Sequence, residues 1–276
     1  MKLDNKIAVV TGAGGVLCSA FARELAKNGA HVMLLDINKD AVNSLATELK
    51  EQGYKANGYE CNVLDKASIE AVHNDILQSY GKCNILVNGA GGNNPRCTIA
   101  HEYYEQGEEK LNDIKTFFNL DKEDFGFVFD LNLIGTLLPT QVFSVDMVNS
   151  DGVIVNVSSM NAFRPLTKIP AYSSAKSAVS NLTMWLSVHL ASAKIRVNAI
   201  APGFFVTKQN QALLFNDDGT PTPRTEKILN ATPMNRFGKP EELLGTLMWL
   251  CDNEASGFVT GIVVPVDGGF SAYSGV

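Results

Sequence analysis

Short apolar segments recur along the chain and alternate with longer amphipathic ones. The apolar segments are rich in β-branched residues, as in IAVVT (7–11) and HVMLLD (31–36). Runs of this kind predict strands that are buried on both faces of a sheet. The other expected strands lie at 56–63, 84–90, 153–159, 194–200 and 262–266.

The segments between these strands have helical periodicity, clearest in residues 40–53 and 66–81. In the second segment, four apolar side chains are expected on one helical face: Ile69, Val72, Ile76 and Leu77. Alternating strands and helices predict an α/β fold. We therefore expect one domain over residues 1–276, a Rossmann-type doubly wound parallel sheet with helices on both faces.

Two stretches interrupt the alternation. Residues 92–124 are polar and charged, and residues 204–238 contain three prolines and an Asp-Asp-Gly sequence. Long excursions of this kind are often lids or binding loops. The segment 204–238 is therefore expected to be lid-like, with a surface insertion or a subunit contact as the alternative.

Composition and charge narrow the classes of partner. The net charge of −6 and the lack of a long basic run argue against nucleic acid. No apolar stretch reaches the length of a membrane span, and the N-terminal segment lacks the layout of a signal peptide. Five cysteines and four histidines are scattered without metal-ligand spacing. We expect free thiols, no metal and a reducing, cytoplasmic location.

The segment TGAGGVLCSA (11–20) joins the first expected strand to a helix. In this context a glycine-rich turn places a dinucleotide pyrophosphate on the helix N-terminus. Gly12 would supply the tight turn, whereas Val16 and Cys18 occupy positions where such loops more often have glycine. An ordinary strand-to-helix turn is the alternative interpretation.

Asp36 ends the second expected strand, 24 residues after Gly12. A carboxylate at this place can accept hydrogen bonds from the ribose hydroxyls of a dinucleotide and repel a 2′-phosphate. The residue therefore favours NAD over NADP. The alternative is that Asp36 caps the next helix.

Tyr172 and Lys176 are four residues apart in a segment expected to be helical, so they would share one helical face. A phenol has a pKa of about 10. A neighbouring ammonium favours the phenolate, which could then exchange a proton with an alcohol. Ser159 lies at the end of the preceding expected strand, where its hydroxyl could hold the substrate oxygen.

These motifs together resemble the short-chain dehydrogenase/reductase family over nearly the whole chain. The matching segments are TGAGGVLCSA (11–20), NGAG (88–91), LNLIGT (131–136), VSS (157–159), YSSAK (172–176), VNAIAPGFFVT (197–207) and VDGG (266–269). The resemblance implies four catalytic residues. Tyr172 would be the acid/base, Ser159 would position the reacting oxygen, Lys176 would also bind the nicotinamide ribose, and Asn132 would hold a water of the proton relay.

The resemblance also implies an NAD cofactor and a homo-oligomer, with a tetramer as the first expectation. The backbone of Phe205 and the side chain of Thr207 would lie at the nicotinamide carboxamide, and Asn62 and Val63 at the adenine. The expected cofactor contacts are Gly12, Gly15, Val16, Leu17, Asp36, Ile37, Asn62, Val63, Asn88, Ala90, Gly91, Tyr172, Lys176, Pro202, Phe205 and Thr207.

Within the family, seven segments resemble the D-mannonate oxidoreductase (D-fructuronate reductase) branch. They are GVLC (15–18), NGAGGNNP (88–95), FDLNLIGTLLPTQ (129–141), SSMNAFRPLTKIPAYS (158–173), NQALLFNDDG (210–219), PMNRFGKPEELLGTLMWL (233–250) and GGFSAYSGV (268–276). This likeness implies hydride transfer between D-mannonate and D-fructuronate, a small sugar-acid substrate. Another sugar-acid or polyol dehydrogenase, such as a gluconate 5-dehydrogenase, is the alternative. A non-catalytic nucleotide-binding regulator is a third hypothesis, against which the intact set of four catalytic residues argues.

A sugar-acid substrate introduces a carboxylate, which a guanidinium can bind with two parallel hydrogen bonds. Arg164, five residues past Ser159, is the first candidate, and Lys168 and Arg236 are the next. The other expected substrate contacts are Asn93, Ser159, Asn161 and Tyr172. The alternative is that Arg164 is a solvated loop charge or pairs with an acid across a subunit contact.

Overall fold

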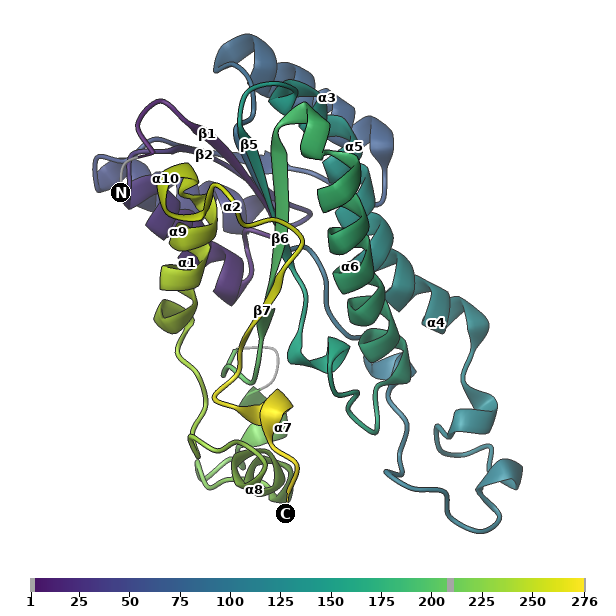
Figure 1. The fold of residues 1–276 in the computed structure, drawn as a ribbon. Helices are drawn as coiled ribbons and strands as arrows, with labels where there is room; N and C mark the ends of the chain where they lie inside the picture. The colour runs from purple at the N-terminus through teal and green to yellow at the C-terminus, as the bar shows by residue number, and fades with distance from the viewer. Residues whose placement is uncertain (1–2, 208–210, 276) are drawn as a thin grey trace.

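Seven parallel strands form one sheet in the order β3-β2-β1-β4-β5-β6-β7 (Figure 1). The computed structural model describes residues 3–207 and 211–275. The strands are β1 (Ile7–Thr11), β2 (His31–Asp36), β3 (Ala56–Glu60), β4 (Ile85–Asn88), β5 (Gly152–Val157), β6 (Ile195–Pro202) and β7 (Val263–Val266). The strand order reverses between β1 and β4, which confirms the predicted doubly wound fold.

Helices cover both faces of this sheet (Figure 1). They are α1 (Val16–Lys27), α2 (Lys39–Glu51), α3 (Lys66–Ser79), α4 (Lys122–Phe129), α5 (Gly135–Met147), α6 (Pro170–His189), α7 (Gln211–Leu214), α8 (Pro223–Asn230), α9 (Leu244–Cys251) and α10 (Asn253–Ser256). Helices α1, α2 and α9 contribute to one hydrophobic core, and α3, α5 and α6 contribute to the other.

Successive side chains of a strand belong to different hydrophobic cores. In β1, Ala8 and Val10 belong to the core beneath α1, whereas Ile7 and Val9 belong to the core beneath α3. Successive side chains of a strand point to opposite faces, so a continuous apolar run fills both layers at once. This is why the sequence of the central strands does not alternate with polar residues.

Helix α3 confirms most of the predicted apolar face but not all of it. Ile69, Val72 and Ile76 are buried, whereas Leu77 is 37% exposed. Leu77 follows Ile76 directly, so it is rotated from it by about 100° around the helix axis. Leu77 therefore lies at the edge of this face, where it is only partly covered.

A continuous helical stretch, Lys122–Met147, runs through α4 and α5. It is the one helix in the described part of the chain that is long and apolar enough to cross a membrane by length and composition. It packs against α3, β4 and β5, and 44% of its most apolar window is buried inside the molecule. These contacts are those of a core helix.

The two excursions project beyond the same end of the sheet (Figure 1). The first contains only short 3-10 turns before α4, and the second contains α7 and α8. All five cysteines are free thiols and are buried: Cys18, Cys61, Cys83, Cys97 and Cys251. Within residues 3–207 and 211–275, no three His, Cys, Asp or Glu side chains are grouped so that they could hold a metal ion.

Candidate active site

The loops after β1 and β4 are bound to each other at the carboxyl edge of the sheet. The Thr11 hydroxyl accepts hydrogen bonds from the backbone N–H groups of Gly89 (3.0 Å) and Ala90 (3.2 Å). Gly12 has a φ of +67°, and a Cβ atom there would lie 2.8 Å from the Ala90 backbone. The predicted tight turn therefore needs glycine both for its conformation and for its close approach to the second loop.

The two unusual residues of the glycine-rich loop fit the structure for different reasons. Val16 is the first residue of α1 and does not have a positive φ, so its backbone does not require glycine. Cys18 packs over Gly89, where a Cβ atom would overlap the Cys18 sulfur. Gly89 is not among the residues that the sequence singles out. Because Gly89 has no side chain, Cys18 fits at a position of α1 where glycine is more common.

Asp36 holds the glycine-rich loop. Its carboxylate accepts hydrogen bonds from the N–H groups of Gly14 (3.0 Å) and Asn38 (2.9 Å). Asn38, not Asp36, caps α2, because its side-chain oxygen accepts from the N–H of Ala41. The capping alternative for Asp36 is therefore wrong. The neighbouring Ile37 is exposed beside this carboxylate.

Three other expected cofactor contacts differ in exposure. Val63 is buried against Gly135, where an added Cβ atom would contact its side chain. Asn62 is exposed, and its side-chain oxygen accepts a hydrogen bond from the N–H of Leu64 (3.0 Å). Asn88 is 1% exposed. Its side-chain amide donates to the Thr140 hydroxyl and to Asn156, both at 2.9 Å. The Asn88 side chain is therefore part of the core, so only its backbone is available to a ligand.

The predicted catalytic residues come together around Gly91. A Cβ atom on Gly91 would lie 2.6 Å from Asn132 Oδ1 and 3.2 Å from Lys176 Nζ. Lys176 Nζ donates to the Val157 carbonyl (2.8 Å) and lies 5.7 Å from the centroid of the Tyr172 ring. Ser159 follows β5 and its hydroxyl is hydrogen-bonded to the Tyr172 phenol. The end of β5, the first turns of α6 and the helix before α5 thus supply one polar site.

Burial dominates the electrostatics of this site. It lowers the pKa of Lys176 to about 8 and raises the pKa of Tyr172, while the hydrogen bond from Ser159 lowers the pKa of Tyr172. The Lys176 ammonium donates to the Val157 carbonyl and lies 5.7 Å from the centroid of the Tyr172 ring, and its effect on the phenol pKa stays a prediction.

Asn132 lies in a π-helical turn, Asp130–Ile134, between α4 and α5. Its side chain accepts from the Gly92 N–H (3.1 Å) and donates to the carbonyls of Gly92 (2.8 Å) and Val128 (2.8 Å). Turns of this type often occur at functional sites. Asn132 therefore clamps the loop after β4, and its role in holding a water stays a prediction.

The asparagines expected at the substrate have different surroundings. Asn161 is buried, its N–H donates to the Ser159 hydroxyl (3.2 Å), and its Oδ1 has no hydrogen-bond partner in the described part of the chain. Asn93 donates to the Thr98 hydroxyl (3.0 Å) on the first excursion. Asn161 therefore offers a buried acceptor next to Ser159.

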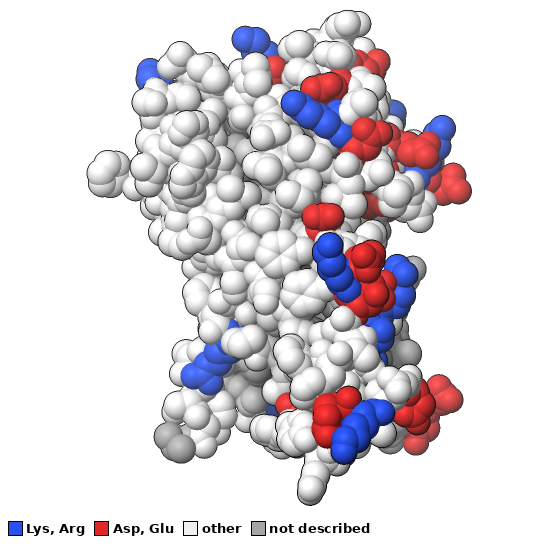
Figure 2. Space-filling model, turned by 90° about the vertical axis from the view of Figure 1, so that its right-hand side faces the viewer, with Lys and Arg blue, Asp and Glu red and all other residues white. Residues whose placement is uncertain are grey.

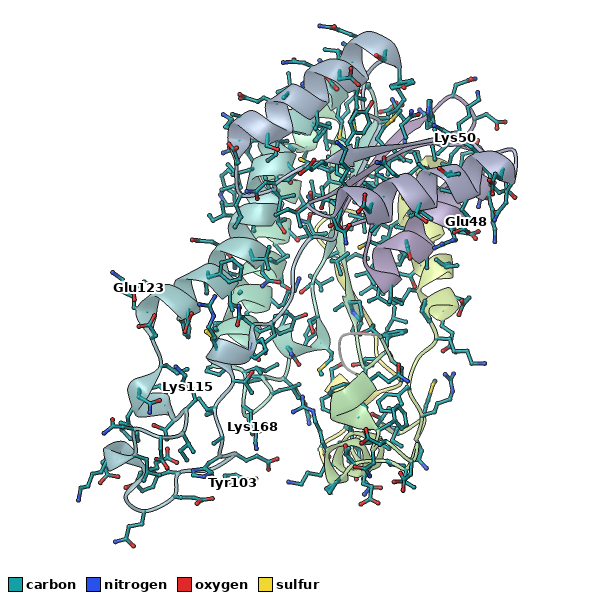
Figure 3. The ribbon with its side chains drawn as sticks, turned by 180° about the vertical axis from the view of Figure 1, so that it is seen from behind. Glu48, Lys50, Tyr103, Lys115, Glu123 and Lys168 are labelled. Carbon is teal, nitrogen blue, oxygen red and sulfur yellow. The ribbon has the colours of Figure 1, made fainter. Side chains whose placement is uncertain are left out.

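The three cations expected near a substrate carboxylate already have partners. The Arg164 guanidinium donates to the carbonyl of Tyr273, and Lys168 Nζ donates to the carbonyl of Ala100 (2.5 Å). Arg236 forms an ion pair with Glu242 at 2.6 Å. Figure 3 shows Lys168 on the loop between the first excursion and the α7–α8 region.

The segment that follows β6 borders a cavity of about 360 Å³. Phe205 is buried in its wall and forms a β-bridge with Gly238, which closes the base of the second excursion. Pro202 ends β6, and Thr207 follows two residues after Phe205. The residues expected at the nicotinamide end thus lie on one segment that enters the excursion.

Comparisons with known proteins agree with this architecture. The family model for short chain dehydrogenases matches residues 6–217. The oxidoreductase UxuB of Bacillus subtilis, itself uncharacterised, is 50% identical over 99% of this chain and 98% of its own. A crystal structure with bound NAD, of a proposed D-mannonate oxidoreductase from Haemophilus influenzae, is 55% identical. It has a TM-score of 0.95 and covers 100% of this chain and 98% of its own.

A more distant solved structure has the same fold. The gluconate 5-dehydrogenase of Burkholderia cenocepacia, in complex with NADP and tartrate, is 27% identical with a TM-score of 0.84, over 98% of this chain and 97% of its own. The family model covers most of the chain, and the close relatives match it nearly end to end. The chain belongs to the short-chain dehydrogenase/reductase family of oxidoreductases.

Proposed function

We propose that this protein is an NAD(H)-dependent oxidoreductase that interconverts D-mannonate and D-fructuronate by hydride transfer at C5. The observation that carries the proposal is the gathering of Tyr172, Lys176, Ser159 and Asn132 around Gly91. The 55% identity to the proposed D-mannonate oxidoreductase of Haemophilus influenzae supports the choice of substrate.

The glycine-rich loop fits a dinucleotide. Gly15 precedes α1 without a side-chain cap, so the first N–H groups of this helix can donate to phosphate oxygens. Asp36 places a carboxylate beside the same loop, which suits ribose hydroxyls and disfavours a 2′-phosphate. NAD, when bound, accepts or supplies the hydride.

The chain's own residues handle the proton. In the direction of reduction, the Tyr172 hydroxyl donates its proton to the carbonyl oxygen of the substrate, and Ser159 donates a hydrogen bond to the same oxygen. In the direction of oxidation, Tyr172 accepts the proton of the alcohol. Burial keeps Tyr172 protonated at neutral pH, which suits the donor role in reduction.

The proposed substrate is a small sugar acid, and the proposed assembly is a homo-oligomer in the cytoplasm. Asn161 and Asn93 are proposed to contact the sugar hydroxyls. Arg164, which lies in the loop before Tyr172, is the first candidate for the carboxylate. Its bond to the Tyr273 carbonyl means that the guanidinium would have to serve two partners.

The test is the oxidation of NADH with a panel of carbonyl substrates. The panel contains D-fructuronate, 5-keto-D-gluconate and an uncharged ketose of similar size. We expect the highest kcat/KM with D-fructuronate. A higher value with 5-keto-D-gluconate would favour a gluconate 5-dehydrogenase, and turnover of neutral ketoses alone would reject a sugar-acid enzyme.

A further inference from the structure

A second cavity, of about 140 Å³, lies where three separate parts of the chain meet. The first excursion contributes Glu102, the loop before α6 contributes Lys168, and α8 contributes Arg224 and Lys227. Apolar side chains such as Ile169 and Ile228 complete the wall. Its lining, apolar with a few converging charged groups, is of the kind found at ligand sites.

The charges of this cavity do not cancel. Lys227 pairs with Glu102, whose two carboxylate oxygens lie 3.0 and 3.1 Å from its Nζ. Lys168 Nζ is held by the neutral carbonyl of Ala100. Arg224 forms no hydrogen bond and no ion pair within residues 3–207 and 211–275. The cavity therefore has an excess of positive charge, and its guanidinium is the group without a partner there.

Arg224 and Lys227 are three residues apart on α8, so they lie on the same helical face as Ile228. This spacing explains why both cations border one cavity. The Glu102–Lys227 ion pair ties α8 to the first excursion and so fixes the face that presents Arg224. The Glu102–Lys227 pair therefore holds α8 in place without using the N–H donors of Arg224.

The cavity adjoins the catalytic side of the molecule. Ile169 in its wall directly precedes Pro170, where α6 begins, and Tyr172 lies in the first turn of that helix. Phe204 lines this cavity and also the larger one that contains Phe205. The excess positive charge is therefore placed next to the loop that leads to the acid/base.

From these observations we infer that Arg224 is the residue that recognises the substrate carboxylate, with Lys168 as a second positive charge nearby. The inference rests on the proposed function and specifies which residue selects acids over neutral sugars. Arg164 and Arg236 are less suited, because the first is bound to Tyr273 and the second is neutralised by Glu242. A guanidinium without a partner can grip a carboxylate through two parallel hydrogen bonds.

The experiment compares Arg224→Met with Arg164→Met and with Arg23→Met, a matched control. Arg23 pairs with Glu48 on the α1–α2 side, which is remote from Lys168 in Figure 3. Two readouts are taken with NADH present. The first is kcat/KM for D-fructuronate and for a neutral ketose, and the second is the dissociation constant of D-gluconate and of xylitol, measured calorimetrically.

We expect Arg224→Met to weaken D-gluconate binding by roughly 10- to 100-fold, as for loss of a hydrogen-bonded charge, with xylitol binding and thermal stability unchanged. Arg224→Lys should recover part of the loss. Equal weakening of both ligands, a larger effect from Arg164→Met, or no binding of D-gluconate to the wild type would overturn the inference. If D-gluconate binds through Arg224 while D-fructuronate is not reduced, the proposed function fails and the inference stands.

Discussion

Burial of the Lys176 side chain, which its proposed catalytic role requires, lowers the stability of the folded protein. Its side chain is 4% exposed, and burial lowers its pKa to about 8 from the ordinary 10.5. Between these two pH values the unfolded chain binds more protons than the folded one. The stability of the wild type should therefore rise with pH over this interval. At neutral pH the loss of stability caused by burying the Lys176 ammonium should be fully present.

Replacing Lys176 by Met should stabilise the protein at pH 7 while abolishing turnover. A pKa unit corresponds to about 1.4 kcal/mol, so the gain is at most about 3–4 kcal/mol, reduced by the lost bond to the Val157 carbonyl. The gain should shrink towards pH 10. Urea denaturation without cofactor measures it, with Lys122→Met on exposed α4 as the control. An equally or less stable variant at pH 7 would contradict the burial penalty.

Tyr172→Phe should remove nearly all turnover and leave NADH binding intact. The substitution keeps the ring and deletes only the oxygen that exchanges the proton. Steady-state kinetics and NADH fluorescence titration separate the two effects. Tyr103→Phe, on the exposed first excursion, is the matched control and should retain full activity. Turnover above a small fraction of the wild-type rate would exclude Tyr172 as the acid/base.

Asp36 should determine the choice between NADH and NADPH. Because a like-charge contact with a 2′-phosphate is costly, Asp36→Ala should reduce the preference for NADH at least about tenfold in kcat/KM. Asp36→Asn keeps an acceptor for the Gly14 N–H and so separates charge from loop support. If the wild type prefers NADPH, the assignment of the cofactor is wrong.

At the scale of elements, the sequence predicts some features and not others for physical reasons. The central strands are predictable because they are continuous apolar runs, whereas β3 (ANGYE) is a weaker signal. The placement of Tyr172 and Lys176 on one face follows from helical spacing. The π turn that directs Asn132 to Gly92 depends on packing between distant segments, so no local pattern indicates it. For the same reason no local pattern points to Arg224, since its cavity forms only where α8 meets the first excursion.

The contact between α1 and the loop after β4 can be tested by a double-mutant cycle. Gly89→Ala places a methyl group against the Cys18 sulfur and should destabilise the protein by about 1–3 kcal/mol, as overpacking does. Cys18→Ala should relieve most of this loss in the double mutant. Gly92→Ala is the control, because a Cβ atom there meets no other atom within 4 Å. Additive losses at the two sites would show that the residues are not coupled.

At the scale of the whole molecule, one side is poor in charge. Figure 2 shows a broad area without charged residues on the side that carries α5 and α6. The exposed apolar side chains of these two helices are Val145, Met184, Trp185 and Val188. That the protein is a homo-oligomer stays a prediction, which this face supports. That residues 1–276 form one domain also stays a prediction, which the single sheet supports.

We expect subunits to associate through this face. Val188 is 79% exposed, so a charge there should disturb an interface without disturbing the core. Val188→Glu should lower the mass measured by light scattering during gel filtration, with unchanged far-UV circular dichroism. Tyr104→Glu, also at an exposed apolar position, should leave the mass unchanged. An assembly that survives both substitutions would place the interface elsewhere.

Each of the five buried thiols can report when the region around it opens. Burial raises the pKa of each thiol, so a thiol reagent should modify it only while its surroundings are open. Cys18 lies in the first turn of α1, Cys97 in the first excursion and Cys251 in α9. Labelling rates resolved by peptide mass would therefore time the opening of each region separately, without any introduced probe.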